Sequence, residues 1–175
     1  MNLPESAVAL LFFLPAGASN MAPVLANKLP YITRFKTPLD FGFSYRGHRV
    51  FGKNKSWRGL FSGIIFGTFV GWLMHMWFFA DEPLGHYLLV AAAMSAGALI
   101  GDAVESFFKR QRGIQSGNPW FPFDQTDFII GGLLFILPFD TLSLSLVLWI
   151  FGWFFGLHLL SAYVGYLLGL KDKPI

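Results

Sequence analysis

The 175-residue sequence has no cysteine and only four histidines, so it offers neither disulfides nor the thiolate and imidazole clusters that hold zinc. Charged residues are also scarce, at 13% of the chain, whereas 54% of the residues are hydrophobic and 18% are aromatic. A soluble domain carries about twice that share of charge. The composition therefore excludes an ordinary soluble protein and indicates a chain that crosses a membrane several times.

Long apolar runs give the number of crossings. A helix needs about 20 apolar residues to span the hydrocarbon core of a bilayer. Pro138 and Asp140 break the long apolar stretch near the C-terminus into a short fourth helix and a long fifth one. The first segment lacks the basic start of a cleavable signal peptide, so we interpret it as a helix of the folded protein. The sequence predicts an all-α integral membrane protein with five transmembrane helices, at about 5–26, 60–80, 86–107, 126–138 and 142–169.

The basic residues test this number of helices. Five crossings place residues 28–59, residues 108–126 and the C-terminal tail on one side, and these segments hold all 13 Lys and Arg residues. The opposite side holds four acidic residues and no basic one: Glu5, Asp81, Glu82 and Asp140. Because cytoplasmic loops are enriched in Lys and Arg, we expect an outside N-terminus, a cytoplasmic C-terminus and a single membrane-embedded domain over residues 1–175.

Small residues recur where helices are expected to pack. Gly59, Gly63, Gly67 and Gly71 are spaced by four along the second helix, and the third begins with an Ala- and Gly-rich run. Such residues let helices approach closely within lipid, so we interpret them as packing positions.

Three charged residues end the third helix. Asp102, Glu105 and Lys109 are spaced so that they share one helix face. Asp102 follows an apolar run without a break and is expected at the edge of the hydrocarbon, where a carboxylate is costly and usually functional or paired. Glu105 and Lys109 are predicted to form an i,i+4 ion pair, which is compatible with a functional role.

Two further acids, Asp124 and Asp127, end a loop rich in Gly, Pro and aromatic residues just before the fourth helix. Either of them can cap that helix, which leaves the other unexplained. A pair of carboxylates also suits Mg²⁺, which takes oxygen ligands from one or two carboxylates, waters and substrate phosphates. Residues 52–59, GKNKSWRG, have two readings as well, either the positive flank of a membrane helix or a phosphate-binding segment.

Two of these motifs together resemble the CDP-diacylglycerol synthase family of integral-membrane cytidylyltransferases. One is GDAVESFFKRQRGIQSG at 101–117, followed by PFDQTD at 122–127, and the other is GKNKSWRG. The short chain, PLDFGFSYRGHRVFGKNKSWRG and the C-terminal GLKDKP resemble the archaeal branch, the CDP-archaeol synthases. Gln125 departs from the family pattern, because arginine is usual at its position.

The resemblance implies a nucleotidyltransferase of phospholipid biosynthesis. It would transfer a cytidylyl group from CTP to an isoprenoid ether-lipid phosphate of the 2,3-di-O-geranylgeranylglyceryl phosphate class, forming CDP-archaeol and pyrophosphate at a cytoplasmic site in the cell membrane. The implied catalytic residues are Asp102, Asp124, Asp127 and Lys109. One or two Mg²⁺ ions would be held by Asp102, Glu105, Asp124 and Asp127. The implied substrate-binding residues are Lys53, Lys55, Ser56, Arg58, Ser106 and Arg110.

The expected partners are CTP, the isoprenoid glycerol-phosphate lipid and the bilayer, with no nucleic acid and with a homodimer left open. The alternatives are a CDP-diacylglycerol synthase acting on diacyl phosphatidic acid, a small membrane transporter or a non-catalytic assembly subunit. A CDP-alcohol phosphatidyltransferase needs an Asp-Gly pair, which the chain lacks. Three residues keep two readings each: Trp57 as interfacial or stacked on cytosine, His158 as packing or in the site, and Asp40 as a turn or substrate residue.

Overall fold

The part of the chain that the structure describes contains five helices. The computed structural model describes residues 3–26, 37–52 and 54–169. The helices are α1 (Glu5–Ala26), α2 (Trp57–Phe78), α3 (Leu84–Gln111), α4 (Phe123–Ile136) and α5 (Leu144–Leu167). Within these described residues, α1, α2, α3 and α5 are long and apolar enough to cross a membrane. α4 has 14 residues, so at 1.5 Å per residue it is about 21 Å long, short of the roughly 30 Å core of a bilayer.

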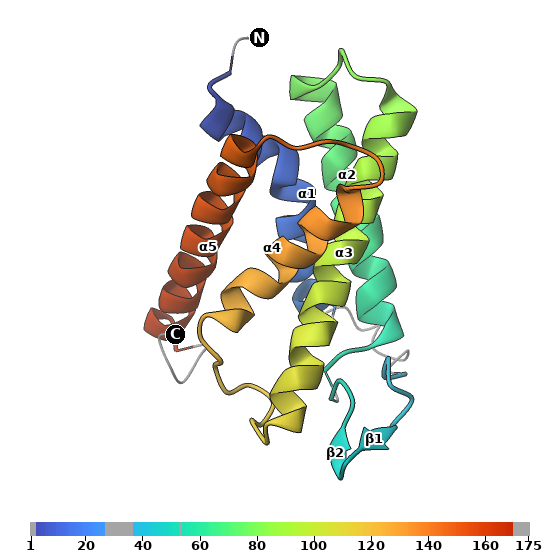
Figure 1. Ribbon diagram of the computed structural model, residues 1–175, viewed down its shortest axis with the longest axis vertical. Coiled ribbons are helices and arrows are strands. Elements are labelled where there is room, and N and C mark those ends of the chain that lie inside the picture. The colour runs from blue at the N-terminus through green and yellow to red at the C-terminus, as the bar shows by residue number, and fades with distance from the viewer. Residues whose placement is uncertain (1–2, 27–36, 53, 170–175) are drawn as a thin grey trace.

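The helices alternate in direction, with α1, α3 and α5 running one way and α2 and α4 the other (Figure 1). The lower end in that view carries the α3–α4 loop and a small hairpin, β1 (Ser44–Tyr45) paired with β2 (His48–Arg49). The hairpin is an addition to the predicted all-α fold. Its two turn residues, Arg46 and Gly47, both have positive φ angles, 51° and 81°, as two-residue hairpin turns require.

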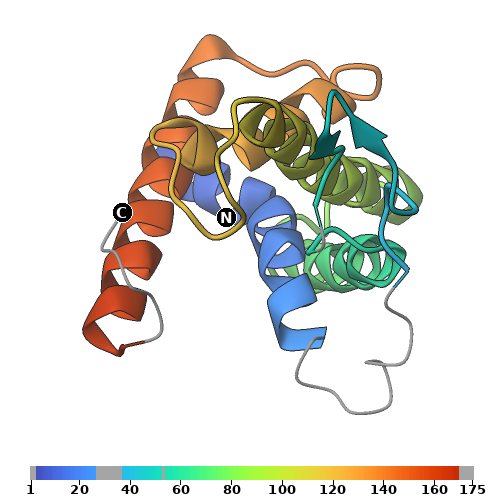
Figure 2. The same cartoon turned by 90° about the horizontal axis from the view of Figure 1, so that it is seen from below.

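The apolar core is shared by four helices. Phe13 of α1, Met94 of α3, Ile129 of α4 and Ile150 of α5 are all almost fully buried in one cluster. α5 packs against α1 and α4 only along one side, and Figure 2, seen from below, shows it standing at the edge of the bundle. Its remaining faces expose large apolar side chains, as a helix that faces lipid does.

Glycines decide how closely the helices approach. A Cβ on Gly67 of α2 would lie 2.7 Å from the Pro15 carbonyl oxygen of α1, and a Cβ on Gly71 would lie 2.5 Å from the Ala91 Cβ of α3. The predicted small-residue packing of the second helix is therefore confirmed.

α3 and α4 approach each other still more closely. A Cβ on Gly101 would lie 2.3 Å from the carbonyl oxygen of Asp127, and a Cβ on Gly97 would lie 2.3 Å from that of Gly131. Because nothing larger than hydrogen fits at these positions, the backbones touch, and the acidic end of α3 lies against the first turns of α4.

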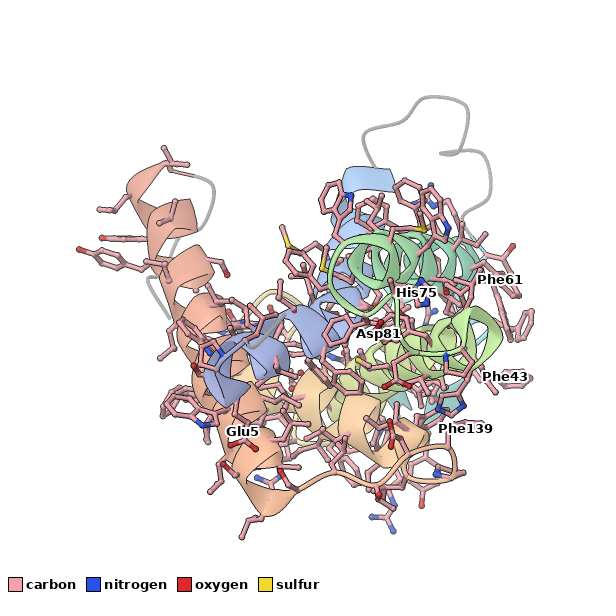
Figure 3. All side chains as sticks on the ribbon, turned by 90° about the horizontal axis from the view of Figure 1, so that it is seen from above. Glu5, Phe43, Phe61, His75, Asp81 and Phe139 are labelled. Carbon is pink, nitrogen blue, oxygen red and sulfur yellow. The ribbon has the colours of Figure 1, made fainter. Side chains whose placement is uncertain are left out.

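The two ends of the bundle differ in charge. The described Lys and Arg residues all belong to the hairpin region, the start of α2 or the end of α3 and the loop after it, all at the lower end in Figure 1: Arg46, Arg49, Lys55, Arg58, Lys109, Arg110 and Arg112. Figure 3 looks down on the opposite end, where Glu5, Asp81 and Phe139 lie on the start of α1, the α2–α3 turn and the α4–α5 connection. The described basic and acidic residues therefore lie at opposite ends of the bundle, as predicted, although four of the described helices, rather than five, are long enough to cross a membrane.

Candidate active site

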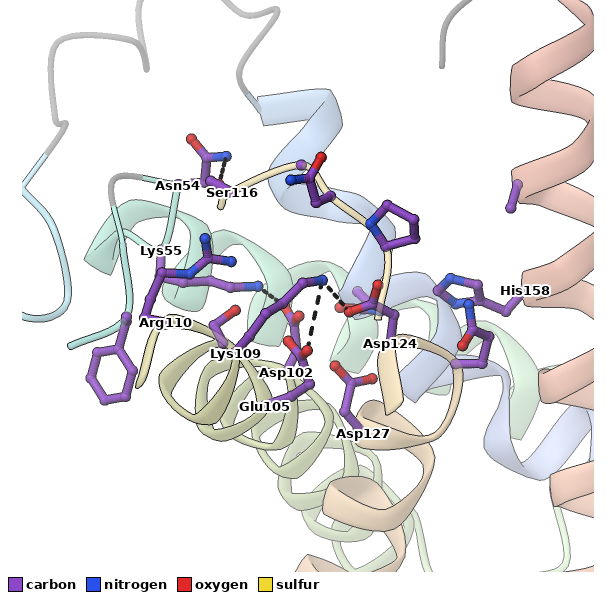
Figure 4. A pocket seen from close by; sticks show the side chains of 18 residues that line it. Asn54, Lys55, Asp102, Glu105, Lys109, Arg110, Ser116, Asp124, Asp127 and His158 are labelled. Carbon is purple, nitrogen blue, oxygen red and sulfur yellow. Dashed lines mark hydrogen bonds and ion pairs between the residues drawn. The ribbon is translucent and has the colours of Figure 1, made fainter. Parts of the chain in front are cut away.

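A polar pocket of about 550 Å³ opens at the basic end of the bundle (Figure 4). It is lined by Phe51, Asn54 and Lys55, the last turns of α3, residues 116–119, the first turns of α4, and single positions on α1 and α5. Segments that are far apart in the sequence therefore meet around one cavity. Its volume falls within the roughly 300–1,000 Å³ of small-molecule sites.

Three carboxylates converge in this pocket. Asp102 and Glu105 of α3 and Asp127 of α4 each place one oxygen within 4.8 Å of the others. Oxygens that share one Mg²⁺ ion are about 3 to 4 Å apart, so small side-chain rotations bring them into range. Glu105 Oε1 is buried and accepts no hydrogen bond among the described residues. These hard oxygen donors fit a divalent cation such as Mg²⁺, and the close contact of α3 with α4 assembles them.

Lysines also lie within this cluster. Lys55 forms an ion pair with Asp102. Lys109 Nζ is 2.5 Å from Asp124 Oδ1 and 3.7 Å from Glu105 Oε1, which confirms the predicted i,i+4 pair. The Lys109 side chain is only 8% exposed, so its charge is held among carboxylates inside the protein. Cations and acids therefore alternate around the pocket.

Asp124 has contacts of a different kind. Besides Lys109, it accepts a hydrogen bond of 2.8 Å from the Trp120 backbone N–H. The residue that precedes α4 is Pro122, which makes no side-chain capping bond, so neither Asp124 nor Asp127 is the N-cap. In this arrangement Asp124 fixes the α3–α4 loop and Lys109, while Asp127 has no ion-pair partner in the part of the chain that the structure describes.

Asp40 organises the loop that leads to the basic motif. Its carboxylate pairs with Arg49 at 2.5 Å and accepts backbone hydrogen bonds from Gly42, Phe51 and Gly52. Burial alone would raise the pKa of Asp40, but the hydrogen bonds from Arg49 and the three backbone N–H groups outweigh it and lower the pKa to about 2. Between the two readings of Asp40, the geometry favours the turn.

Further contacts join this loop to α3 and the loop after it. Asn54 Nδ2 donates a hydrogen bond of 3.0 Å to Ser116 Oγ. Gly52 has a φ of 95°, and a Cβ there would lie 3.8 Å from Arg110 Cδ. The positive φ turns the chain beside Arg110, so the basic motif becomes one wall of the pocket.

Most of the predicted site residues meet here. The pocket is lined by all four predicted acids and also by Lys55, Ser106, Lys109 and Arg110. Ser56 instead caps α2, because its Oγ accepts the Gly59 N–H at 3.2 Å, and it borders a neighbouring cavity beside Lys55. Arg58 lies on the first turn of α2, outside the pocket lining. Lys53 lies outside the described residues.

Sequence reasoning did not assign several polar residues that line the pocket: Asn20, Asn54, Ser116, Asn118 and Gln125. His158, for which it left a packing reading and a site reading open, also lines the pocket. Asn54 and Ser116 lie inside the two quoted motifs, so position was an available signal for both. Asn20 and His158 come from apolar helices, whose orientation the sequence does not give. Trp57 packs against Phe61 and Phe41, which favours its interfacial reading.

An apolar groove of about 470 Å³ runs between α3 and α4. Its walls include the exposed side chains of Ile100, Val104 and Phe108 on α3, and of Ile130 and Leu134 on α4. Arg112 and Trp120 lie at its loop end, with the guanidinium carbon 5.1 Å from the indole ring centre. Glu105 and Asp127 line both this groove and the polar pocket. The two carboxylates therefore form a shared wall between the polar cavity and the apolar one.

The family model described as CarS-like, CDP-archaeol synthase, matches residues 7–175. The CDP-archaeol synthase of Thermococcus onnurineus is 36% identical, over 99% of this chain and 99% of its own length. The chain belongs to the CDP-archaeol synthase family. Another CDP-archaeol synthase, from Pyrococcus abyssi, is 36% identical over 95% of this chain and 96% of its own length.

A solved structure of an intramembrane enzyme for archaeal membrane lipids biosynthesis has the same fold. It superposes with a TM-score of 0.75 at 30% identity, covering 87% of this chain and 91% of that chain. With the family match, this confirms the predicted mostly helical membrane fold and the predicted class of CTP-dependent nucleotidyltransferase. CDP-archaeol synthases form CDP-archaeol, so the diacyl-lipid and transporter alternatives are not favoured.

Proposed function

We propose that this protein transfers the cytidylyl group of CTP to the phosphate of 2,3-di-O-geranylgeranylglyceryl phosphate or a closely related ether lipid. The product is CDP-archaeol, and pyrophosphate is released. The observation that carries the proposal is the shared wall of Glu105 and Asp127 between a polar pocket and an apolar groove. The reaction joins a water-soluble triphosphate to a bilayer lipid, so it needs both kinds of cavity at one point.

The polar pocket is the proposed CTP site. A triphosphate and a lipid phosphate bring several negative charges together, and Lys55, Lys109 and Arg110 supply positive charge around the cavity. In the structure described here, Lys55 and Lys109 pair with acids of the same pocket. These pairs keep the carboxylates and ammonium groups in place until the phosphates arrive, when the lysines turn to the phosphate oxygens.

One or two Mg²⁺ ions are the proposed cofactor. Asp102, Glu105 and Asp127 would hold the metal, and Asp124 would act beside them through Lys109. Bound there, the metal would neutralise phosphate charge and orient the reacting oxygens. The roles of these residues as ligands rest on their convergence in the pocket and on their oxygen chemistry.

The apolar groove is the proposed lipid site. Its exposed apolar walls suit isoprenoid chains that remain in the bilayer, and Arg112 at its loop end suits the anionic headgroup. An oxygen of the lipid phosphate attacks the α-phosphorus of CTP across the shared wall. The bond from the α-phosphorus to the bridging oxygen breaks, and pyrophosphate leaves with that electron pair. Because the lipid phosphate attacks directly, no covalent enzyme intermediate is needed, and because it is already ionised near neutral pH, no strong general base is needed.

The basic end of the bundle is proposed to face the cytoplasm, where CTP is present, with the start of α1 on the outer side. Residues 1–175 would then form a single membrane-embedded domain. The separation of basic and acidic residues to opposite ends supports this orientation.

Detergent-purified protein with labelled CTP and Mg²⁺ tests the function. Label should enter the lipid-extractable fraction with the geranylgeranyl ether phosphatidate, and less so with diacyl phosphatidate. Asp127→Asn should lower turnover by at least about 100-fold, because it removes a proposed metal ligand. Asp81→Asn, an exposed acid at the opposite end, is the matched control. Transfer of label only to diacyl lipid, or full turnover by Asp127→Asn, would refute the proposal.

A further inference from the structure

Gln125 is the most deeply buried polar side chain of the polar pocket, at 2% exposure. It lies in the first turns of α4, between Asp124 and Asp127. Its Oε1 atom is buried and accepts no hydrogen bond from any described residue. An amide oxygen left without a donor in the interior is unfavourable, so a rotation that turns this oxygen into the pocket would let a ligand with a donor satisfy it.

The pocket has a charged side and a neutral side. In Figure 4, Lys55 and Arg110 lie on one side of the carboxylates and His158 lies on the other. Gln125 and Phe128 are three residues apart and share a face of α4, and the Phe128 ring lies 6.0 Å from the His158 ring. This face of α4 is therefore directed to the side of the pocket where His158 lies.

We infer that Gln125 recognises the cytosine base of CTP by accepting a hydrogen bond from the exocyclic 4-amino group. This inference rests on the proposed function. The triphosphate occupies the side with Lys55 and Arg110, the carboxylates lie beside the α-phosphate, and the base lies at the neutral side. A planar carboxamide offers one acceptor and one donor in the same plane, which matches the amino group and N3 of cytosine.

The same contact rejects uracil. Uracil carries a carbonyl oxygen where cytosine carries the amino group, so an amide held with Oε1 toward the base would face a second acceptor, and only an amide turned by about 180° would pair with uracil. A site built to hydrogen-bond a substrate group discriminates strongly against an analogue that lacks it, because a buried polar atom is then left without a partner. Gln125 is on this account a specificity-determining residue.

The test compares Gln125→Met, which keeps the length of the side chain and removes both polar atoms, with the wild type. Both proteins are assayed for lipid labelling with CTP, with UTP and with a CTP analogue that lacks the 4-amino group. Inhibition by inorganic triphosphate, which has no base, and the melting temperature show whether the variant folds and keeps its phosphate site. Gln125→Asn, which withdraws the amide by one methylene, is the second variant.

In the wild type, kcat/KM for CTP should exceed that for UTP and for the analogue by about tenfold or more. Gln125→Met should lower kcat/KM for CTP by about tenfold and leave kcat/KM for the analogue nearly unchanged. Inorganic triphosphate should inhibit this variant as strongly as it inhibits the wild type. The inference would be overturned if Gln125→Met lowered kcat/KM equally for CTP and for the analogue, or if the variant kept the wild-type preference for CTP over UTP. If the Gln125→Met variant does not fold, the same comparisons are made with Gln125→Asn. A wild type that labels no lipid with CTP would instead refute the proposed function itself.

Discussion

Replacing Gly101 with alanine tests whether the contact between α3 and α4 builds the acidic cluster. The added Cβ would lie 2.3 Å from the Asp127 carbonyl oxygen and 3.1 Å from the Gly131 Cα. Unstrained nonbonded contacts of carbon are about 3.5 Å, so the helices must separate locally by roughly 1 Å. That shift moves Asp102 and Glu105 of α3 away from Asp127 of α4.

The size of the effect follows from the tolerance of metal sites. Ligand distances must be right to within about 0.2 Å, and a displacement of about 1 Å in a catalytic arrangement costs on the order of 100-fold in rate. We therefore expect Gly101→Ala to lower lipid labelling by about that factor and to raise the Mg²⁺ concentration needed for half-maximal turnover.

The matched control is Gly152→Ala on α5, where an added Cβ would meet no heavy atom within 4 Å. Alanine there favours the helix by about 0.5–1 kcal/mol, and turnover should be unchanged. Melting temperatures of both variants separate a local change from unfolding. If folded Gly101→Ala kept turnover within about threefold of the wild type at the same Mg²⁺ concentration, the link between helix contact and cluster would be wrong.

Three more predictions follow from the pocket, the loop and the groove. Lys55→Met should raise the KM for CTP by about tenfold and weaken inhibition by pyrophosphate by a similar factor, both measured by lipid labelling. Unchanged inhibition by pyrophosphate would contradict the proposed role of Lys55 in binding phosphate. The folded-state pKa of Asp40 lies below its usual 3.8, so the stability that its ionised carboxylate contributes is complete above pH 3.8 and is lost as the pH falls towards about 2. The melting temperature of the wild type should fall over this pH range, and Asp40→Asn should remove that part of the pH dependence. Ile130→Trp should obstruct the groove and slow lipid turnover without changing CTP binding, whereas Leu148→Trp, on an exposed α5 position, should change neither.

The helices were the most predictable part of the protein. Runs of apolar residues and the placement of Lys and Arg gave all five, because the cost of exposing charge to lipid is large and acts locally along the chain. The predicted ends of the helices were less accurate. α3 runs from Leu84 to Gln111, beyond both ends of the predicted span of about 86–107. The hairpin escaped prediction because strands of two residues have no alternating pattern to detect.

The chemistry of the site was predictable from the motifs, but the pairing of its residues was not. Asp102, Glu105 and Asp127 converge as the proposed metal set, whereas Asp124 contacts Lys109 and a backbone N–H. Which carboxylate faces a lysine depends on how two helices approach, and spacing along the chain does not contain that information. His158 shows the same limit, since α5 is apolar all round and its sequence does not give the rotation about its axis.

The wall formed by Glu105 and Asp127 has a consequence for the fate of the products. In the proposed reaction, a lipid headgroup would react there while its chains remain in the hydrocarbon, so no extraction of the lipid from the bilayer would oppose turnover. Pyrophosphate would leave through the polar pocket into water, and the CDP-lipid would leave along the apolar groove and diffuse within its leaflet. The two products would therefore separate at the carboxylates without sharing an exit.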